Sequence, residues 1–181
     1  MNDNRNIEKT MTDIIFLFLT GALIGWCYEV MLHIFTSDTF VNRGMLHGPW
    51  LPIYGVGCLI IVGLKKMAGK KVPVYFVIST AACGVIEYIT SWGMEMIYHT
   101  RWWDYSNFPL NLNGRIFAGG LLGFGLAGCL FSYGLLPILT KQYRKIPTKA
   151  KRVIVLGFML IFLMDIVWSL FCPNMGVGIT G

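Results

Sequence analysis

Five stretches of this chain are nearly unbroken runs of apolar residues, and short polar segments separate them. A helix needs about 20 residues to cross the hydrocarbon core of a bilayer, and four of the runs reach that length. We therefore predict an all-α, polytopic membrane protein that forms a single transmembrane domain over residues 1–181. Its five transmembrane helices are expected at Ile14–Ile34, Trp50–Leu64, Val72–Tyr98, Ile116–Leu139 and Val153–Cys172.

The second apolar run differs from the others because it is short and has Pro49 and Pro52 at its beginning. A helix that starts late leaves non-helical backbone at membrane depth, which is tolerated only where protein or water satisfies its polar groups. The sequence therefore predicts a cavity near His47–Tyr54.

Small residues recur four positions apart in the fourth run, at Gly119, Gly123 and Ala127. This spacing lets two helix backbones approach each other closely. We interpret the stripe as a helix-packing surface rather than as a functional site.

The pattern W-x-x-E-x-x-x-H-x-x-x-x-D occurs twice, at an offset of 66 residues. The first copy consists of Trp26, Glu29, His33 and Asp38. The second copy consists of Trp92, Glu95, His99 and Asp104. The simplest explanation is a duplicated helix–loop–helix unit, with repeat A at about 12–66, repeat B at about 72–140 and an extra helix at about 153–172. We expect the polar loops that connect the helices of the two hairpins to face each other and to form one outward-opening site.

Composition and charge support a membrane protein and assign its orientation. Charged residues make up 13% of the chain, whereas a soluble domain has about 25%. The net charge of +6 is not evidence for nucleic-acid binding, because twelve of the 15 cations fall on one side of the five predicted crossings. By the positive-inside rule that side is cytoplasmic, so the N-terminus is expected inside and the C-terminus outside. The twelve are Arg5, Lys9, Lys65, Lys66, Lys70, Lys71, Lys141, Arg144, Lys145, Lys149, Lys151 and Arg152.

Several signals of other functions are missing from the sequence. The N-terminus has no signal-peptide cleavage pattern, so we expect a retained first helix. The five cysteines lie in or beside apolar runs and indicate buried thiols rather than disulfides. There is no phosphate-binding G-x-x-x-x-G-K-[ST] loop and no hydrolase motif, so no cofactor is expected and any ATP-driven activity requires a separate cytoplasmic ATPase.

Buried charge identifies the candidate site. Glu29, Glu87 and Asp165 are predicted at similar heights in the outer half of the membrane, where an unpaired charge costs several kcal/mol. One interpretation is structural, with the glutamates pairing with outer-loop arginines. The other is functional, with the same groups lining a cavity that binds a cation, a proton or a polar substrate. The candidate residues are Glu29, Asn42, Arg43, Tyr54, Glu87, Glu95, Arg101, Trp103, Asp104, Tyr105, Asn113 and Arg115.

Two further readings concern the histidines and the aromatic residues. Glu29 and His33, like Glu95 and His99, are spaced i, i+4 on one helix face, and the two pairs together offer four ligands to a transition metal. Interfacial, hydrogen-bonded histidines are the default interpretation, so no metal is expected. Trp102, Trp103 and Tyr105 are more typical of an aromatic belt at the outer membrane surface than of a ligand box, and Asp104 is expected to be a salt-bridged loop anchor.

Four strings resemble a known bacterial family. They are GWCYE (Gly25–Glu29), NRGMLHGPWLPIYGVG (Asn42–Gly57), EYITSWGMEM (Glu87–Met96) and RWWDYSNFPLNLNGRI (Arg101–Ile116). They are similar to the CmpB-like family of type IV ABC-transporter proteins, from the first to the fourth predicted helix. The resemblance implies a membrane component of a transport system in the bacterial cytoplasmic membrane, without naming a substrate. The resemblance centres on the glutamates and on the Asn-Arg-Gly and Trp-Trp-Asp-Tyr-Ser stretches and does not extend to His33 or His99.

The leading hypothesis is a permease component whose glutamates and loop arginines bind a small substrate or ion. An alternative is a membrane-embedded enzyme that acts on a lipid or lipid-linked substrate at the outer leaflet, with a glutamate as acid/base and arginines on a phosphate. A third hypothesis is that the protein is a non-catalytic structural or regulatory subunit. The expected partners are the lipid bilayer, a cytoplasmic ATPase or another membrane subunit, and a second copy of the chain, but no nucleic acid.

Overall fold

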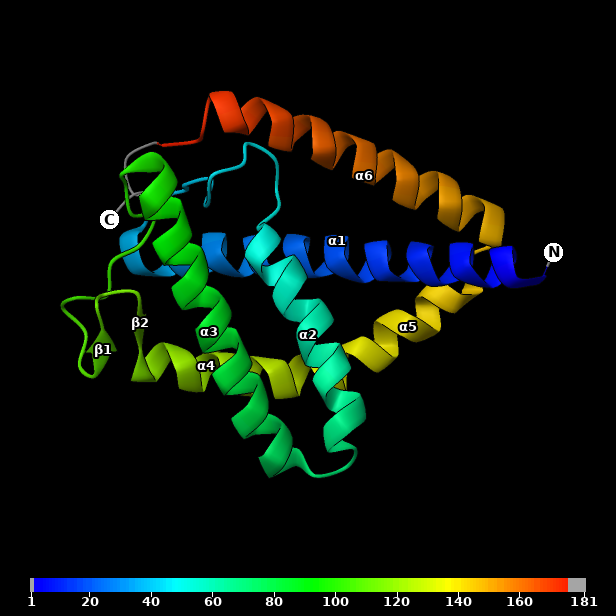
Figure 1. Ribbon diagram of the computed structural model, residues 1–181, viewed down its shortest axis with the longest axis horizontal. Helices are drawn as coiled ribbons and strands as arrows, with labels where there is room; N and C mark the ends of the chain where they lie inside the picture. Colours follow the sequence, from blue (N-terminus) through cyan, green and yellow to red (C-terminus); the bar gives the residue numbers. More distant parts are fainter. Residues whose placement is uncertain (1, 176–181) are drawn as a thin grey trace. The chain divides into compact units, whose positions relative to one another are not determined.

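A computed structural model describes the backbone of residues 2–175, which is helical apart from one short hairpin and the connecting loops (Figure 1). The helices are α1 (Asn2–Ser37), α2 (Pro52–Ala68), α3 (Val72–Tyr98), α4 (Ala118–Cys129), a π-helix η1 (Leu130–Leu135), α5 (Leu136–Lys145) and α6 (Thr148–Phe171). Because α4, η1 and α5 follow one another without a break, the described chain forms five helical segments. The predicted all-α class is confirmed.

Four of these segments have the length and composition of membrane-spanning helices within the described residues. They are Thr10–Ser37, Val72–Tyr98, Ala118–Lys145 and Thr148–Phe171. The protein is therefore a multi-pass membrane protein. The fifth predicted crossing corresponds to α2, which has 17 residues and is shorter than the other four.

Local chemistry explains where α2 and α3 begin and end. Pro52 is the first residue of α2, a position at which the missing proline N–H is not needed for a helical hydrogen bond. The helix therefore starts two residues later than the predicted Trp50. Helix α3 has the predicted bounds, with a proline in its first turn, and it ends where His99 adopts a left-handed conformation and donates its N–H to the Glu95 carbonyl.

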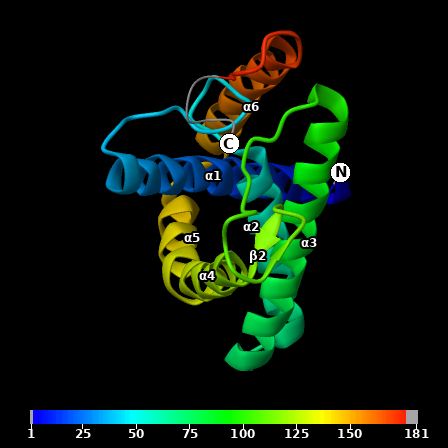
Figure 2. The same ribbon diagram turned by 90° about the vertical axis from the view of Figure 1, so that its left-hand side faces the viewer.

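The described chain divides into two compact units. The first contains the chain up to Leu59 together with Thr140–Asn174, and the second is built on Ile60–Leu139. In the first unit, the loop between α1 and α2 has no regular secondary structure and lies between α1 and α6 (Figures 1 and 2). The buried core of this first unit is formed by Ala22, Leu46, Trp50 and Phe162.

In the second unit, α3 packs against α4 at small residues of α4. A Cβ atom added at Gly125 would overlap Thr80 and Phe76, and one added at Gly128 would lie 3.5 Å from the Ser79 hydroxyl oxygen. The packing stripe predicted from Gly119, Gly123 and Ala127 is wrong, because these three residues are exposed and a Cβ at Gly123 would meet no atom within 4 Å. Spacing alone identified the helix as closely packed but selected the wrong face.

The two copies of the predicted repeat differ in local structure. Helix α1 continues past His33 to Ser37, whereas α3 ends at Tyr98, one residue before His99. The Trp26 indole donates a hydrogen bond to Asn42, whereas Trp92 has 51% of its surface exposed. The duplication therefore stays a prediction.

Candidate functional site

The loop between α1 and α2, Asp38–Leu51, will be called the re-entrant segment because it returns along α1. Its last residue, Leu51, donates its backbone N–H to the Ala22 carbonyl at 3.0 Å. At 1.5 Å per residue, Ala22 lies about 18 Å from Thr10 and about 22 Å from Ser37. The segment thus brings non-helical backbone to the middle of the apolar span of α1, as the prolines of the second run predict.

The carboxylate of Asp165, on α6, anchors the re-entrant segment. One of its oxygens accepts hydrogen bonds from the His47 backbone N–H at 3.1 Å and from the Ser169 hydroxyl at 3.2 Å. The other accepts from the Gly48 N–H at 2.8 Å and from the Trp50 indole at 2.6 Å. Four donors match the capacity of an ionised carboxylate, so this half-buried charge has a structural role.

Two asparagines complete the attachment of the segment. Asn42 accepts from the Trp26 indole at 2.6 Å and donates to the His47 carbonyl at 2.7 Å. Asn174, just after α6, donates its side-chain amide to the carbonyls of Asn42 and Gly44, at 2.9 and 3.1 Å. The segment is therefore held from both α1 and the end of α6, with Arg43 half-buried inside it.

Glu29 and Tyr54 meet where α2 begins. The Tyr54 hydroxyl donates a hydrogen bond to the Glu29 carboxylate, and both side chains are half-buried. Gly25, one turn before Glu29 on α1, makes this contact possible, because a Cβ atom there would overlap the Tyr54 ring. The other Glu29 oxygen has no hydrogen-bond partner among the described residues. Glu29, Tyr54 and Asn42 are defined here as the re-entrant site.

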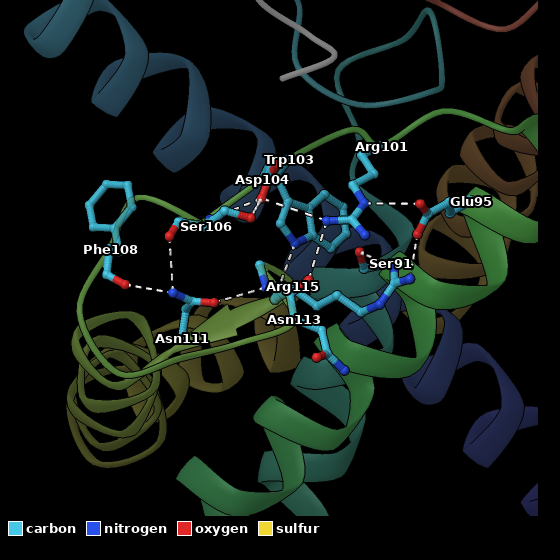
Figure 3. A network of polar contacts seen from close by, with 11 residues as sticks. Ser91, Glu95, Arg101, Trp103, Asp104, Ser106, Phe108, Asn111, Asn113 and Arg115 are labelled. Carbon is cyan, nitrogen blue, oxygen red and sulfur yellow. Dashed lines mark hydrogen bonds and ion pairs between the residues drawn. The ribbon is translucent and has the colours of Figure 1, made fainter.

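The second unit carries a separate group of charges, which consists of Ser91, Glu95, Arg101, Asp104 and Arg115 (Figure 3). It is called the outer-loop cluster after the side of the membrane that the sequence predicts for it. The Glu95 carboxylate accepts from Arg101 Nε at 3.0 Å and also from Arg115. Arg115 has 8% of its surface exposed and donates to the Ser91 hydroxyl at 3.1 Å. Both guanidinium groups therefore donate to the same carboxylate.

Hydrogen bonds within the loop hold the cluster's outer side together. Asp104 accepts from the Ser106 hydroxyl at 2.6 Å and from the Ser106 N–H at 2.9 Å, and it lies 3.7 Å from Arg101. The two Ser106 bonds, followed by the arginine charge, hold the pKa of Asp104 below its ordinary value. The Trp103 indole donates to the Arg115 carbonyl at 3.0 Å (Figure 3). Asp104 is thus a loop anchor, as expected.

The hairpin of β1 (Asn111–Leu112) and β2 (Ile116–Phe117) closes this loop. Gly114 adopts a φ of +67° in its turn, and a Cβ there would overlap the Asp104 and Ser106 side chains. Asn113 donates to the Tyr88 hydroxyl at 2.8 Å, and the Tyr105 N–H donates to the Gly114 carbonyl at 2.7 Å. The loop therefore forms a compact, self-bonded structure over the end of α3.

The aromatic and metal hypotheses can be compared with this geometry. Trp102 has 4% of its surface exposed, so its ring packs inside the protein and not in a lipid-facing belt. In the part of the chain that the structure describes, no three His, Cys, Asp or Glu side chains are grouped to hold a metal ion. His33 instead lies 3.4 Å from the Thr39 hydroxyl.

The structure groups most of the predicted site residues within one unit or the other. Glu95, Arg101, Trp103, Asp104, Tyr105, Asn113 and Arg115 belong to the outer loop and the end of α3, and Glu29, Asn42, Arg43 and Tyr54 belong to α1, the re-entrant segment and α2. Glu87 lies two turns before Glu95 on α3 and is buried. The anchoring roles of Asp165, His47 and Asn174 were not predicted, although a charged residue in the last apolar run was the signal for Asp165.

Comparison with known proteins agrees with the sequence motifs. A family model described as "Putative ABC-transporter type IV" matches residues 16–170, which include the re-entrant site and the outer-loop cluster. No curated protein and no solved structure matches the chain. The matched region covers most of the 181 residues. The chain therefore belongs to the family described as Putative ABC-transporter type IV.

Proposed function

We propose that this protein is the membrane-embedded permease component of a transport system and that the re-entrant site binds its substrate or coupling ion. The observation that carries the proposal is the non-helical backbone that ends at the middle of α1, beside a half-buried carboxylate. Interrupted helices near the membrane midplane are the usual location of binding sites in transporters. Irregular backbone at that depth is also restricted to places where it lines a cavity or is buried in protein.

The chemistry of the site favours a positively charged ligand. Among the residues that the structure describes, Glu29 receives one hydrogen bond, from Tyr54, and its second oxygen is available to a metal cation, a proton or a protonated amine. Arg101 and Arg115 are less suited to bind an anion, because both donate to Glu95. The site is proposed to open outward, with five crossings and a cytoplasmic N-terminus, in the bacterial cytoplasmic membrane. A separate ATPase, in an assembly that contains a second copy of this chain or another membrane subunit, would supply energy.

A second candidate function is that of a non-catalytic structural or regulatory subunit. It is favoured by the outer-loop cluster, where Glu95 pairs with both arginines and the loop forms its own hydrogen bonds. Such a rigid, internally neutral loop suits docking to another protein. If this candidate is correct, the purified protein binds a membrane partner but no small cation.

The test compares two glutamates in the purified, full-length protein. Ligand-induced thermal stabilisation is measured with a panel of metal cations and amines. Glu29→Gln is expected to weaken binding of the active ligand about 10–100-fold, because a charged partner is lost, and Tyr54→Phe to weaken it several-fold. Glu95→Gln and Glu87→Gln serve as matched controls.

The control variants are expected to keep the ligand-dependent shift even where their own melting temperatures fall. Full retention of ligand binding and uptake by a folded Glu29→Gln protein would show that the re-entrant site is not the binding site. Loss of binding in Glu95→Gln alone would instead move the site to the outer loop.

A further inference from the structure

A basic surface lies at the end of the first unit where α5 meets α6 (Figure 1). Six cations and no acidic residue occur between Lys141 and Arg152. The apolar span Thr148–Phe171 begins within this stretch, so the stretch lies at a membrane boundary whichever way the protein is oriented. Asp13 of α1, which lies beside Tyr143, supplies one nearby carboxylate. The positive charge that remains requires an anionic partner or bulk counterions.

One aromatic ring fixes the orientation of this stretch. Tyr143 has 8% of its surface exposed and stacks on Phe16 of α1, with ring centroids 3.9 Å apart and planes 18° apart. Lys151 of α6 places its ammonium 4.2 Å from the centre of the same ring. Elements from α1, α5 and α6 thus meet at Tyr143, and the end of α5 cannot rotate freely.

This fixed orientation turns the cations of α5 outward. Lys141, Arg144 and Lys145 are spaced i, i+3, i+4, so they share one face of the helix, and Tyr143 lies on the other face. All three are exposed, as is Lys149 in the first turn of α6. The result is a preformed group of four exposed cations beside a membrane span.

We propose that Lys141, Arg144, Lys145 and Lys149 form a binding site for the phosphate groups of anionic phospholipids, with Tyr143 as its positioning residue. Charge complementarity selects this occupant, because clusters of lysine and arginine next to a membrane span attract anionic headgroups. A basic helix that lies against the surface adds to this attraction. The site would tie the connection between α5 and α6 to anionic lipid.

The other exposed lysines provide a matched control. Lys66, Lys70 and Lys71, in the turn between α2 and α3, are also exposed, but the lysine beside them, Lys65, is held by the Ser132 carbonyl and the Tyr133 ring. These three residues have the same sign and a similar density of charge. They lack the aromatic ring that orients the α5 face.

The experiment measures lipid binding to the full-length protein in detergent by native mass spectrometry, with phosphatidylglycerol and phosphatidylcholine of identical chains. The wild type is expected to prefer phosphatidylglycerol. The variant Lys141→Gln, Arg144→Gln, Lys145→Gln, Lys149→Gln is expected to lose this preference by at least about tenfold. The control variant Lys66→Gln, Lys70→Gln, Lys71→Gln is expected to keep it.

Tyr143→Phe, which retains the stacked ring, is expected to bind like the wild type, and Tyr143→Ala to lose the preference partly. Equal binding of the two lipids by the wild type, or equal losses in the two glutamine variants, would overturn the proposal. Displacement of the lipid by millimolar inorganic phosphate would also overturn it, in favour of a site for free phosphate.

Discussion

Replacing Asp165 with alanine is expected to lower the free energy of unfolding by about 3 kcal/mol. The substitution removes the common acceptor of the His47 N–H, the Gly48 N–H and the Trp50 indole, which donate to it from the re-entrant segment. Each donor left buried without a partner costs about 1–3 kcal/mol, and partial exposure of Asp165 reduces the total. Thermal unfolding of the purified protein in detergent measures the loss.

Two further variants show whether the anchor is responsible. Asp165→Asn keeps one acceptor oxygen and is expected to cost about half as much. Asp38→Asn, at an exposed position with a left-handed backbone that asparagine also tolerates, is expected to change nothing. The anchoring role is wrong if Asp165→Ala melts at the wild-type temperature.

Replacing Gly25 with alanine is expected to destabilise the protein by about 2–3 kcal/mol and to disrupt the Glu29–Tyr54 contact. Gly25 is buried, and the added methyl group would overlap the Tyr54 ring. The substitution would otherwise help, since alanine is favoured over glycine within a helix by up to about 1 kcal/mol. A loss of stability here therefore reports the close approach of α2 to α1.

Gly57→Ala is the matched control, because it is also helical and a Cβ there would meet no atom within 4 Å. It is expected to be neutral or to stabilise the protein slightly. The two substitutions thus have opposite predicted signs in thermal unfolding. If Gly25→Ala were as stable as Gly57→Ala, α1 and α2 would not pack as described.

The positions of the helices were largely predictable, because a helix that crosses a bilayer needs a long run of apolar residues and such runs are visible in the sequence. Val72–Tyr98 was predicted to the residue, and Pro49 and Pro52 correctly indicated non-helical backbone before α2. The face on which α4 packs was not predictable from Gly119 and Gly123, since in an apolar helix small residues occur on several faces. The contacts of Gly125 and Gly128 in the structure show which face meets α3.

The sequence identified many of the residues that carry the polar groups, but it identified few of their hydrogen-bond partners. Glu95 was expected to pair with an outer-loop arginine, and it holds both Arg101 and Arg115. A charge at Asp165 was predicted within the membrane, but three of its four partners are more than 100 residues away in sequence, and two of these are backbone N–H groups. No residue pattern reports such bonds, because every residue except proline carries the same donor.

The central claim is that the re-entrant segment lines a polar site at membrane depth that opens to the outside. The most direct test is to place a single cysteine at Pro49, which is exposed and two residues from Leu51, in a protein whose five cysteines are replaced. The matched control places it at Leu23, which is 45% exposed and adjoins Ala22 on α1.

A membrane-impermeant maleimide, which reacts with the thiolate, is then applied to intact cells. Cysteine at Pro49 is predicted to react from outside, because water reaches it, and cysteine at Leu23 to stay unmodified, because lipid surrounds it. Absence of reaction at Pro49, or reaction from the cytoplasmic side alone, would contradict an outward-opening site.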